Sequence, residues 1–182
     1  MADHNRYVIL LRAINVGGHN KVPMADLRSA LTAATFSDVS TYIQSGNVVA
    51  DAGHRDEAAV VADVETVMIK RFGLSVPVVA RPVGEWEAIL NANPFPDAVS
   101  EPKLLHVSLC DAAPTPASLA AIDLSAFVPD RLAVVGRHLY LWYPNGSARS
   151  KLTGALLEQR LGVTTTARNW STMVALARMI GG

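Results

Sequence analysis

The sequence predicts an α+β protein made of two similar βαββαβ halves with antiparallel sheets. Short apolar runs and helix-period segments alternate in the order strand, helix, strand, strand, helix, strand between residues 7 and 80, and the same order recurs between residues 103 and 166. Half of the 182 residues are hydrophobic, which is enough to fill two small cores. This order is that of the ferredoxin-like split βαβ motif, repeated once.

The first half begins with a short apolar run at 7–11, whose length and β-branched content indicate a buried strand. Pro23 stands where a first helical residue belongs, and Met24, Leu27 and Leu31 recur at helical spacing, so a helix is expected over 23–34. The remaining expected elements are a strand at 39–43, a turn at 44–47, a strand at 48–50, a helix at 56–71 with Gly73 as C-cap, and a strand at 75–80.

A short helix at 83–90 and the loop Asn93-Pro94-Phe95-Pro96 lead into the second half. Its expected elements are a strand at 103–110, a helix at 116–122, a hairpin of strands 132–135 and 138–143, a helix at 153–161 and a strand at 163–166. Asn169 then caps a terminal helix with an apolar stripe. The predicted organisation is a first half at 1–82, a linker at 83–102, and a second half with the terminal helix at 103–182.

Composition excludes several classes of protein. Lys plus Arg and Asp plus Glu number 16 each, so the net charge lacks the basic excess typical of nucleic-acid binders. The single cysteine, Cys110, rules out a disulfide framework and indicates a reducing compartment. No signal peptide is evident and no apolar run approaches the roughly 20 residues of a membrane span. We expect a cytoplasmic protein without a membrane partner.

The topology predicts one polar cluster in the first half. Strands one and two run parallel and strand three returns, so the loop at 12–21 and the turn at 44–47 lie at the same end of the sheet. Glycine amides, cations and amide side chains together suit a phosphate or carboxylate. The alternative is that they form two turns and a helix start. The candidate ligand-binding residues here are Arg12, Asn15, Gly17, Gly18, Lys21, Gln44, Ser45 and Asn47.

A second polar cluster is expected in the second half, where the segment 147–151 is predicted to lie beside 165–169. Its candidate ligand-binding residues are Ser150, Lys151, Arg168 and Asn169. The alternative is that Ser150 and Asn169 are N-caps, each worth about 1 kcal/mol. Neither cluster has the spacing of a phosphate-binding P-loop or of a dinucleotide fingerprint.

The remaining groups of aromatic, cysteine and histidine residues are predicted to have structural roles and not catalytic ones. His138, Tyr140 and Trp142 alternate along one strand, and we predict core packing for them, although single-stranded RNA binders of this topology stack bases on such residues. Cys110 is predicted to be a packed thiol. The histidines are scattered and no carboxylate pair stands out, so no metal, cofactor or acid–base pair is expected.

Several motifs resemble one family. The segments 11–18, 21–24, 41–49, 93–96, 150–152 and 166–172 are similar to motifs of the bacterial domain of unknown function 1697 family. Ala13, His19 and Ala167 depart from its usual pattern. The resemblance implies a duplicated ferredoxin-like fold and a shared binding site in the polar clusters, and it supplies no substrate.

The leading hypothesis is therefore a binding or catalytic site for an anionic, phosphate-bearing small ligand, in which any chemistry comes from electrostatic stabilisation and positioning. One alternative is a nucleic-acid-binding module that uses the sheet face and the basic loops. Another is a structural or oligomeric interaction protein whose polar loops are turns. The sequence leaves open whether the protein is an enzyme, its oligomeric state, and whether the two clusters form one cleft.

Overall fold

Four strands form the sheet of the first half, in the order β2-β3-β1-β4, and every neighbouring pair is antiparallel. This is the strand order of one ferredoxin-like βαββαβ unit, as predicted. The buried residues of the two main helices recur at helical spacing, so each helix has one apolar face. These faces pack on the side of the sheet that carries Ile9 and Leu11. The elements are β1 (Arg6–Leu11), α1 (Met24–Ala33), β2 (Ser37–Tyr42), β3 (Asn47–Asp51), α2 (Glu57–Val67), the π-helix η1 (Met68–Phe72) and β4 (Val78–Pro82).

The second half repeats this topology, with a sheet in the order β6-β7-β5-β8 and antiparallel pairs throughout. Its core gathers Leu139 and Leu141 of the sheet with Leu157 and Leu161 of a helix. The duplicated fold is thus confirmed. The elements are β5 (Leu105–Cys110), α4 (Pro116–Ala120), the 3-10 helix η3 (Leu124–Phe127), β6 (Arg131–Val135), β7 (His138–Trp142), the 3-10 helix η4 (Ser147–Arg149), α5 (Gly154–Leu161) and β8 (Thr165–Asn169).

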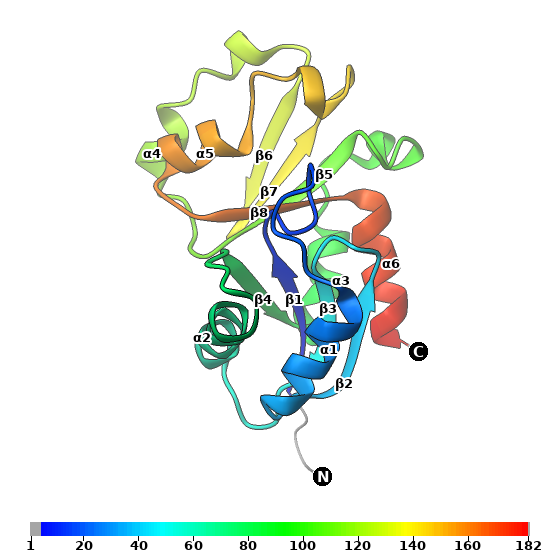
Figure 1. Ribbon diagram of the computed structural model, residues 1–182. Coiled ribbons are helices and arrows are strands. Elements are labelled where there is room, and N and C mark those ends of the chain that lie inside the picture. The colour runs from blue at the N-terminus through cyan, green and yellow to red at the C-terminus, as the bar shows by residue number, and fades with distance from the viewer. Residues whose placement is uncertain (1–4, 182) are drawn as a thin grey trace. The chain divides into compact units, whose positions relative to one another are not determined.

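The computed structural model describes residues 5–181, and the chain divides into two compact units. The first unit takes in the chain up to Glu87 and its last residues from Ala175 on, and the second unit runs from Ala88 to Val174. The two boundaries between the units fall inside helices, α3 (Val83–Asn91) and α6 (Trp170–Gly181), which are labelled in Figure 1. A 3-10 helix, η2 (Pro96–Ser100), follows α3. No helix within residues 5–181 is long and apolar enough to cross a membrane.

The last strand differs from its prediction. It begins two residues later and runs through Asn169, because its backbone pairs with β5 from Cys110 to His106. Arg168 therefore lies on a strand and not in a loop. Asn169 ends this strand and caps α6, since its Oδ1 accepts a hydrogen bond from the Thr172 amide at 3.0 Å. Ser150 is not the cap of α5; Thr153 is, with its hydroxyl accepting from the Leu156 amide.

The aromatic face of β7 is covered, as predicted. Tyr140 is fully buried and its hydroxyl donates to the Ile89 carbonyl at 2.7 Å. The ring of Trp142 lies 6.1 Å from that of Phe95, and the Arg131 guanidinium lies over both rings. The loop after α3 thus has a structural role, because Asn93 folds it into a turn through the Phe95 amide and carbonyl.

Candidate functional site

The two polar loops of the first unit lie side by side. The Leu11 amide donates to the Gly46 carbonyl at 2.9 Å. Asn15 joins the loops directly, because its Nδ2 donates to the Gln44 carbonyl at 2.7 Å and to the Val22 carbonyl at 2.8 Å. Its Oδ1 accepts from the Val22 amide at 2.8 Å. The predicted proximity of 12–21 and 44–47 is confirmed. The amide nitrogen and oxygen of the Asn15 side chain are both hydrogen-bonded to backbone groups.

The turn between β2 and β3 is braced from within. Asn47 is fully buried, and its Nδ2 donates to the Tyr42 carbonyl at 3.1 Å and to the Ser45 hydroxyl at 2.9 Å. Gly46 has a φ of +75°, and a Cβ there would lie 2.8 Å from Ile14 Cδ1. Only glycine fits such a position without displacing the core.

The outer surface of these loops is basic. Lys21 and His19 are exposed and Arg12 is half-buried, whereas residues 5–25 and 39–50 contain no carboxylate. Gly17, Gly18 and Gln44 are exposed beside them. Exposed Val16 and Ile43 lie in the same loops, and Ile43 has a φ of +47°, which is strained for a β-branched residue. The first cluster therefore carries its cations on loops that themselves contain no carboxylate.

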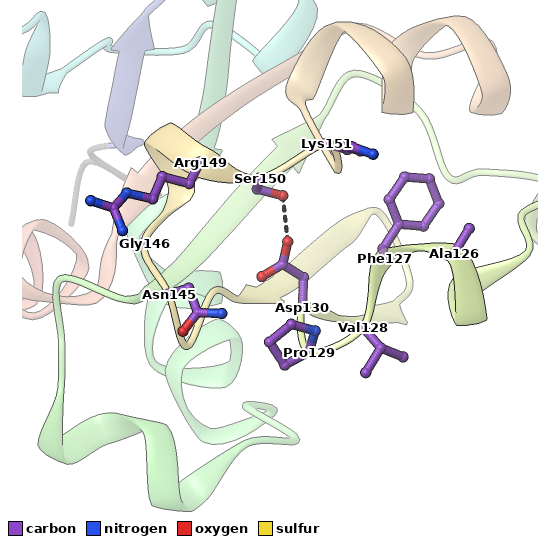
Figure 2. Close-up of a pocket in the computed structure, with 10 residues that line it drawn as sticks. All are labelled: Ala126, Phe127, Val128, Pro129, Asp130, Asn145, Gly146, Arg149, Ser150 and Lys151. Carbon is purple, nitrogen blue, oxygen red and sulfur yellow. Dashed lines mark hydrogen bonds between the residues drawn. The ribbon is translucent and has the colours of Figure 1, made fainter.

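A cavity of about 340 Å³ lies in the second unit, between the segment that precedes β6 and the loop from β7 to α5. We call it the head pocket, and Figure 2 shows its lining. Two of the predicted ligand-binding residues, Ser150 and Lys151, line it. The full lining is Ala126, Phe127, Val128, Pro129, Asp130, Asn145, Gly146, Arg149, Ser150 and Lys151.

Hydrogen bonds hold the walls of the head pocket. The Ser150 hydroxyl donates to Asp130 Oδ2 at 2.6 Å, the bond drawn in Figure 2, and accepts from the Leu152 amide at 2.8 Å. The hydroxyl of buried Tyr143 donates to the Leu152 carbonyl at 3.0 Å. Burial, together with the charge of Asp130, raises the pKa of Tyr143 to about 12. The pocket therefore has a fixed wall on the side of the loop that leads to α5.

Two cations line the same pocket as this carboxylate. Arg149 and Lys151 are exposed and point to opposite sides of the loop in Figure 2, with Asp130 between them. Among residues 5–181, neither side chain has a hydrogen-bond or salt-bridge partner. Both can rotate toward a ligand at the cost of ordering a long side chain, about 2 kcal/mol each at most. The lining carries two positive charges and one negative charge, plus the amide of Asn145.

The comparisons with known proteins agree with the fold. The family model described as "Protein of unknown function (DUF1697)" matches residues 4–140. The chain belongs to this family. A solved structure, that of the conserved bacterial protein SP0830 from Streptococcus pneumoniae, is similar with a TM-score of 0.72 and 24% sequence identity. The similarity covers 96% of this chain and 97% of that one, and at this identity it shows the fold alone. The search of curated proteins found no match.

The two remaining candidates of this DUF1697 family member lie elsewhere in the second unit. Arg168 and Asn169 are half-buried on β8 and do not line the head pocket. Arg168 Nη1 donates to the Ala167 carbonyl at 2.8 Å, and burial lowers its pKa to about 10. The group still carries its charge at neutral pH. The structure thus brings Ser150 and Lys151 together with residues 126–130, not with β8.

Sequence reasoning missed Asp130 and the segment before it. The signal was present in the topology, because β6 begins where β7 ends and Arg131 pairs with Trp142. The loops on either side of that point therefore meet at one end of the sheet. Within residues 5–181, no three His, Cys, Asp or Glu side chains gather as a metal-binding group.

Proposed function

We propose that this protein binds a small phosphate-bearing ligand in the head pocket of its second unit. Arg149 and Lys151 neutralise the phosphate, and Asp130, Ser150 and Asn145 bind hydroxyl or amino groups on the rest of the ligand. The observation that supports this most directly is a cavity of about 340 Å³ with two unpaired cations at its rim and a hydrogen-bonded carboxylate between them.

The mixed charge of the lining narrows the class of ligand. Guanidinium and ammonium groups form strong charge-assisted hydrogen bonds with phosphate oxygens. The Asp130 carboxylate repels a bare anion but accepts from hydroxyl and amino groups, and each such bond adds about 1 kcal/mol or more. A sugar phosphate or a nucleotide has both kinds of group. Any reaction in the pocket would depend on positioning and on electrostatic stabilisation.

The basic loops of the first unit have a secondary place in this proposal. Arg12 and Lys21, with the amides of Gly17 and Gly18, offer contacts for an anion on an exposed surface. Asn15, Ser45 and Asn47 hold those loops in shape through bonds to the chain itself. A surface of this kind suits weak, salt-sensitive attraction of anions more than recognition of one ligand.

A thermal-shift screen of sugar phosphates, nucleotides and inorganic phosphate, with the parent sugars and nucleosides as controls, tests the proposal. We expect phosphate-bearing compounds to raise the melting temperature and their parents to have no effect. The double variant Arg149→Ala/Lys151→Ala should abolish the shift, whereas Lys103→Ala, an exposed cation outside the pocket, should retain it.

Three outcomes would overturn the proposal: no phosphate compound shifts the melting temperature, the double variant keeps the full shift, or only Arg12→Ala and Lys21→Ala remove it. A single-stranded oligonucleotide belongs in the same screen. The structure does not favour base stacking on β7, because Tyr140 is buried under residues 89–95. A shift with the oligonucleotide alone would replace the small ligand by a nucleic acid.

A further inference from the structure

We infer that the ligand is amphipathic: beside its phosphate it carries an apolar group, which enters a second cavity on the other side of Phe127. The inference rests on the proposed function and adds an apolar group to the phosphate and polar groups of its ligand.

The second cavity, here called the tail pocket, has a volume of about 180 Å³. It lies between residues 121–127 and the helix α5. Its apolar lining comes from Ile122, Phe127, Leu156 and Leu157, with Asp123 and Arg160 as the charged members. Three of those apolar side chains, Ile122, Phe127 and Leu156, are only half-buried although they pack on the core of the unit. A ligand that covers them removes more apolar surface from water.

The head and tail pockets adjoin each other. Ala126 and Phe127 line both cavities, so a single short segment separates them. A ligand that places its phosphate beside Lys151 and extends past Phe127 reaches the tail pocket without leaving the protein surface. This continuity distinguishes the tail pocket from an isolated surface hollow.

The separating segment is held mainly by bonds within itself. The Ser125 amide and hydroxyl donate to Asp123 Oδ1 at 3.0 and 2.6 Å, and the Asp130 amide donates to the Phe127 carbonyl at 2.8 Å. The Ser150–Asp130 bond joins its end to the loop that precedes α5. Phe127 can therefore adjust to a ligand without the loss of a strand or a helix, because the segment owes its shape to local contacts.

Size and charge point to the same class of compound. An enclosed apolar cavity of about 150 Å³ holds a benzene molecule in a well-known engineered case. The tail pocket is large enough for a ring or a short branched chain, and each buried methylene should tighten binding about threefold to fourfold. The Asp123 carboxylate, which accepts from Ser125, keeps its negative charge and offsets Arg160 in the tail pocket, so the two cations and one carboxylate of the head pocket leave the combined lining with a net positive charge. The combined site therefore attracts an anion with an apolar arm.

Titration calorimetry with methyl, butyl and phenyl phosphate tests the inference on the full-length protein. We expect the two larger esters to bind at least tenfold more tightly than methyl phosphate. Ala121→Phe, which projects into the tail pocket from the exposed end of α4, should abolish that gain and leave methyl phosphate unaffected. Ala120→Phe is the matched control, because Ala120 is also exposed at this end but does not line the cavity.

The results separate this inference from the proposed function. Equal affinities for the three esters, or a gain that survives Ala121→Phe, would overturn the amphipathic ligand; if methyl phosphate still bound in a manner dependent on Arg149 and Lys151, the proposed function would stand. Absence of binding by every ester, together with a negative sugar-phosphate screen, would overturn both.

Discussion

The two units differ in how a corresponding pair of loops is held together. In the first unit these are the short connection from α1 to β2, residues 34–36, and the loop from β3 to α2, residues 52–56. Their counterparts in the second unit are residues 121–130 and 143–153, which lie between the corresponding helices and strands. In the first unit one arginine joins the pair; in the second unit the same position holds the head pocket.

Arg55 makes the difference. Its Nη2 donates to the Ala34 carbonyl at 2.9 Å, its Nη1 donates to the Ala52 carbonyl at 2.9 Å, and its Nε pairs with Asp63 at 2.6 Å. The guanidinium also lies 4.6 Å from the centre of the Phe36 ring. In the second unit, a single hydrogen bond among the described residues joins the two loops, from Ser150 to Asp130. One topology thus yields one loop pair filled by a side chain and another left open, and the open pair holds the cavity in which we propose that a ligand binds.

The largest loss of stability is expected in the first unit, where Arg55 fills the loop pair. Arg55→Ala should lower the free energy of unfolding by about 3 kcal/mol, because it leaves carbonyl groups and Asp63 without their charged donor. Arg149→Ala in the open pair should change it by less than about 0.5 kcal/mol, since the Arg149 side chain is exposed and has no hydrogen-bond or salt-bridge partner among the described residues. Urea unfolding measures both. Equal losses would show that the two loop pairs are braced alike.

The element order could be predicted from the sequence, because apolar runs and helical periods mark strands and helices directly. The meeting of Asn15 with Gln44 also followed from topology alone. The role of Arg55 could not, since a cation in a loop looks the same whether it is solvated or bonded to carbonyls of a distant turn. The extent of β8 was missed because Arg168 and Asn169 are polar, and their strand conformation comes from pairing with β5.

A second prediction concerns the rigidity of the polar loops of the first unit. Gly46→Ala should destabilise the protein by about 2 kcal/mol or more, because its Cβ would meet Ile14 and Leu11 and its φ is +75°. Gly18→Ala is the matched control: its φ is +80° but nothing lies within 4 Å, so about 1 kcal/mol of backbone strain should be its whole cost. Thermal unfolding of the two variants compares them, and equal costs would mean that Gly46 is not packed as described.

Tyr143 marks another contrast, because Ala52 occupies the corresponding place directly after β3. Tyr143→Phe should cost about 1 kcal/mol at neutral pH through loss of its bond to Leu152. The folded pKa of Tyr143 is about 12, so the unfolded chain releases this proton first as the pH rises above 10. Stability present below pH 10 is therefore lost between pH 10 and about 12.

In Tyr143→Phe this alkaline loss should be smaller, and it should shrink further when Tyr140, whose pKa burial also raises to about 12, is changed to Phe as well. Urea unfolding at several alkaline pH values measures it. If the double variant lost as much stability at alkaline pH as the unmodified protein, the loss would not come from the tyrosines of this unit.

A small loss of stability is also expected for the hydrogen bond that joins the open loop pair. Ser150→Ala removes the donor to Asp130 and the acceptor for the Leu152 amide, yet the site is half-exposed and water can replace both partners. We expect a loss of less than about 1 kcal/mol in urea unfolding, well below that of Arg55→Ala. A loss near 3 kcal/mol would mean that Ser150 braces its loops as firmly as Arg55 does, and the head pocket would then be a rigid structural gap. A small loss, with faster amide exchange confined to residues 121–130, would show that this wall of the pocket can move independently of the core, as the proposed entry of a ligand past Phe127 requires.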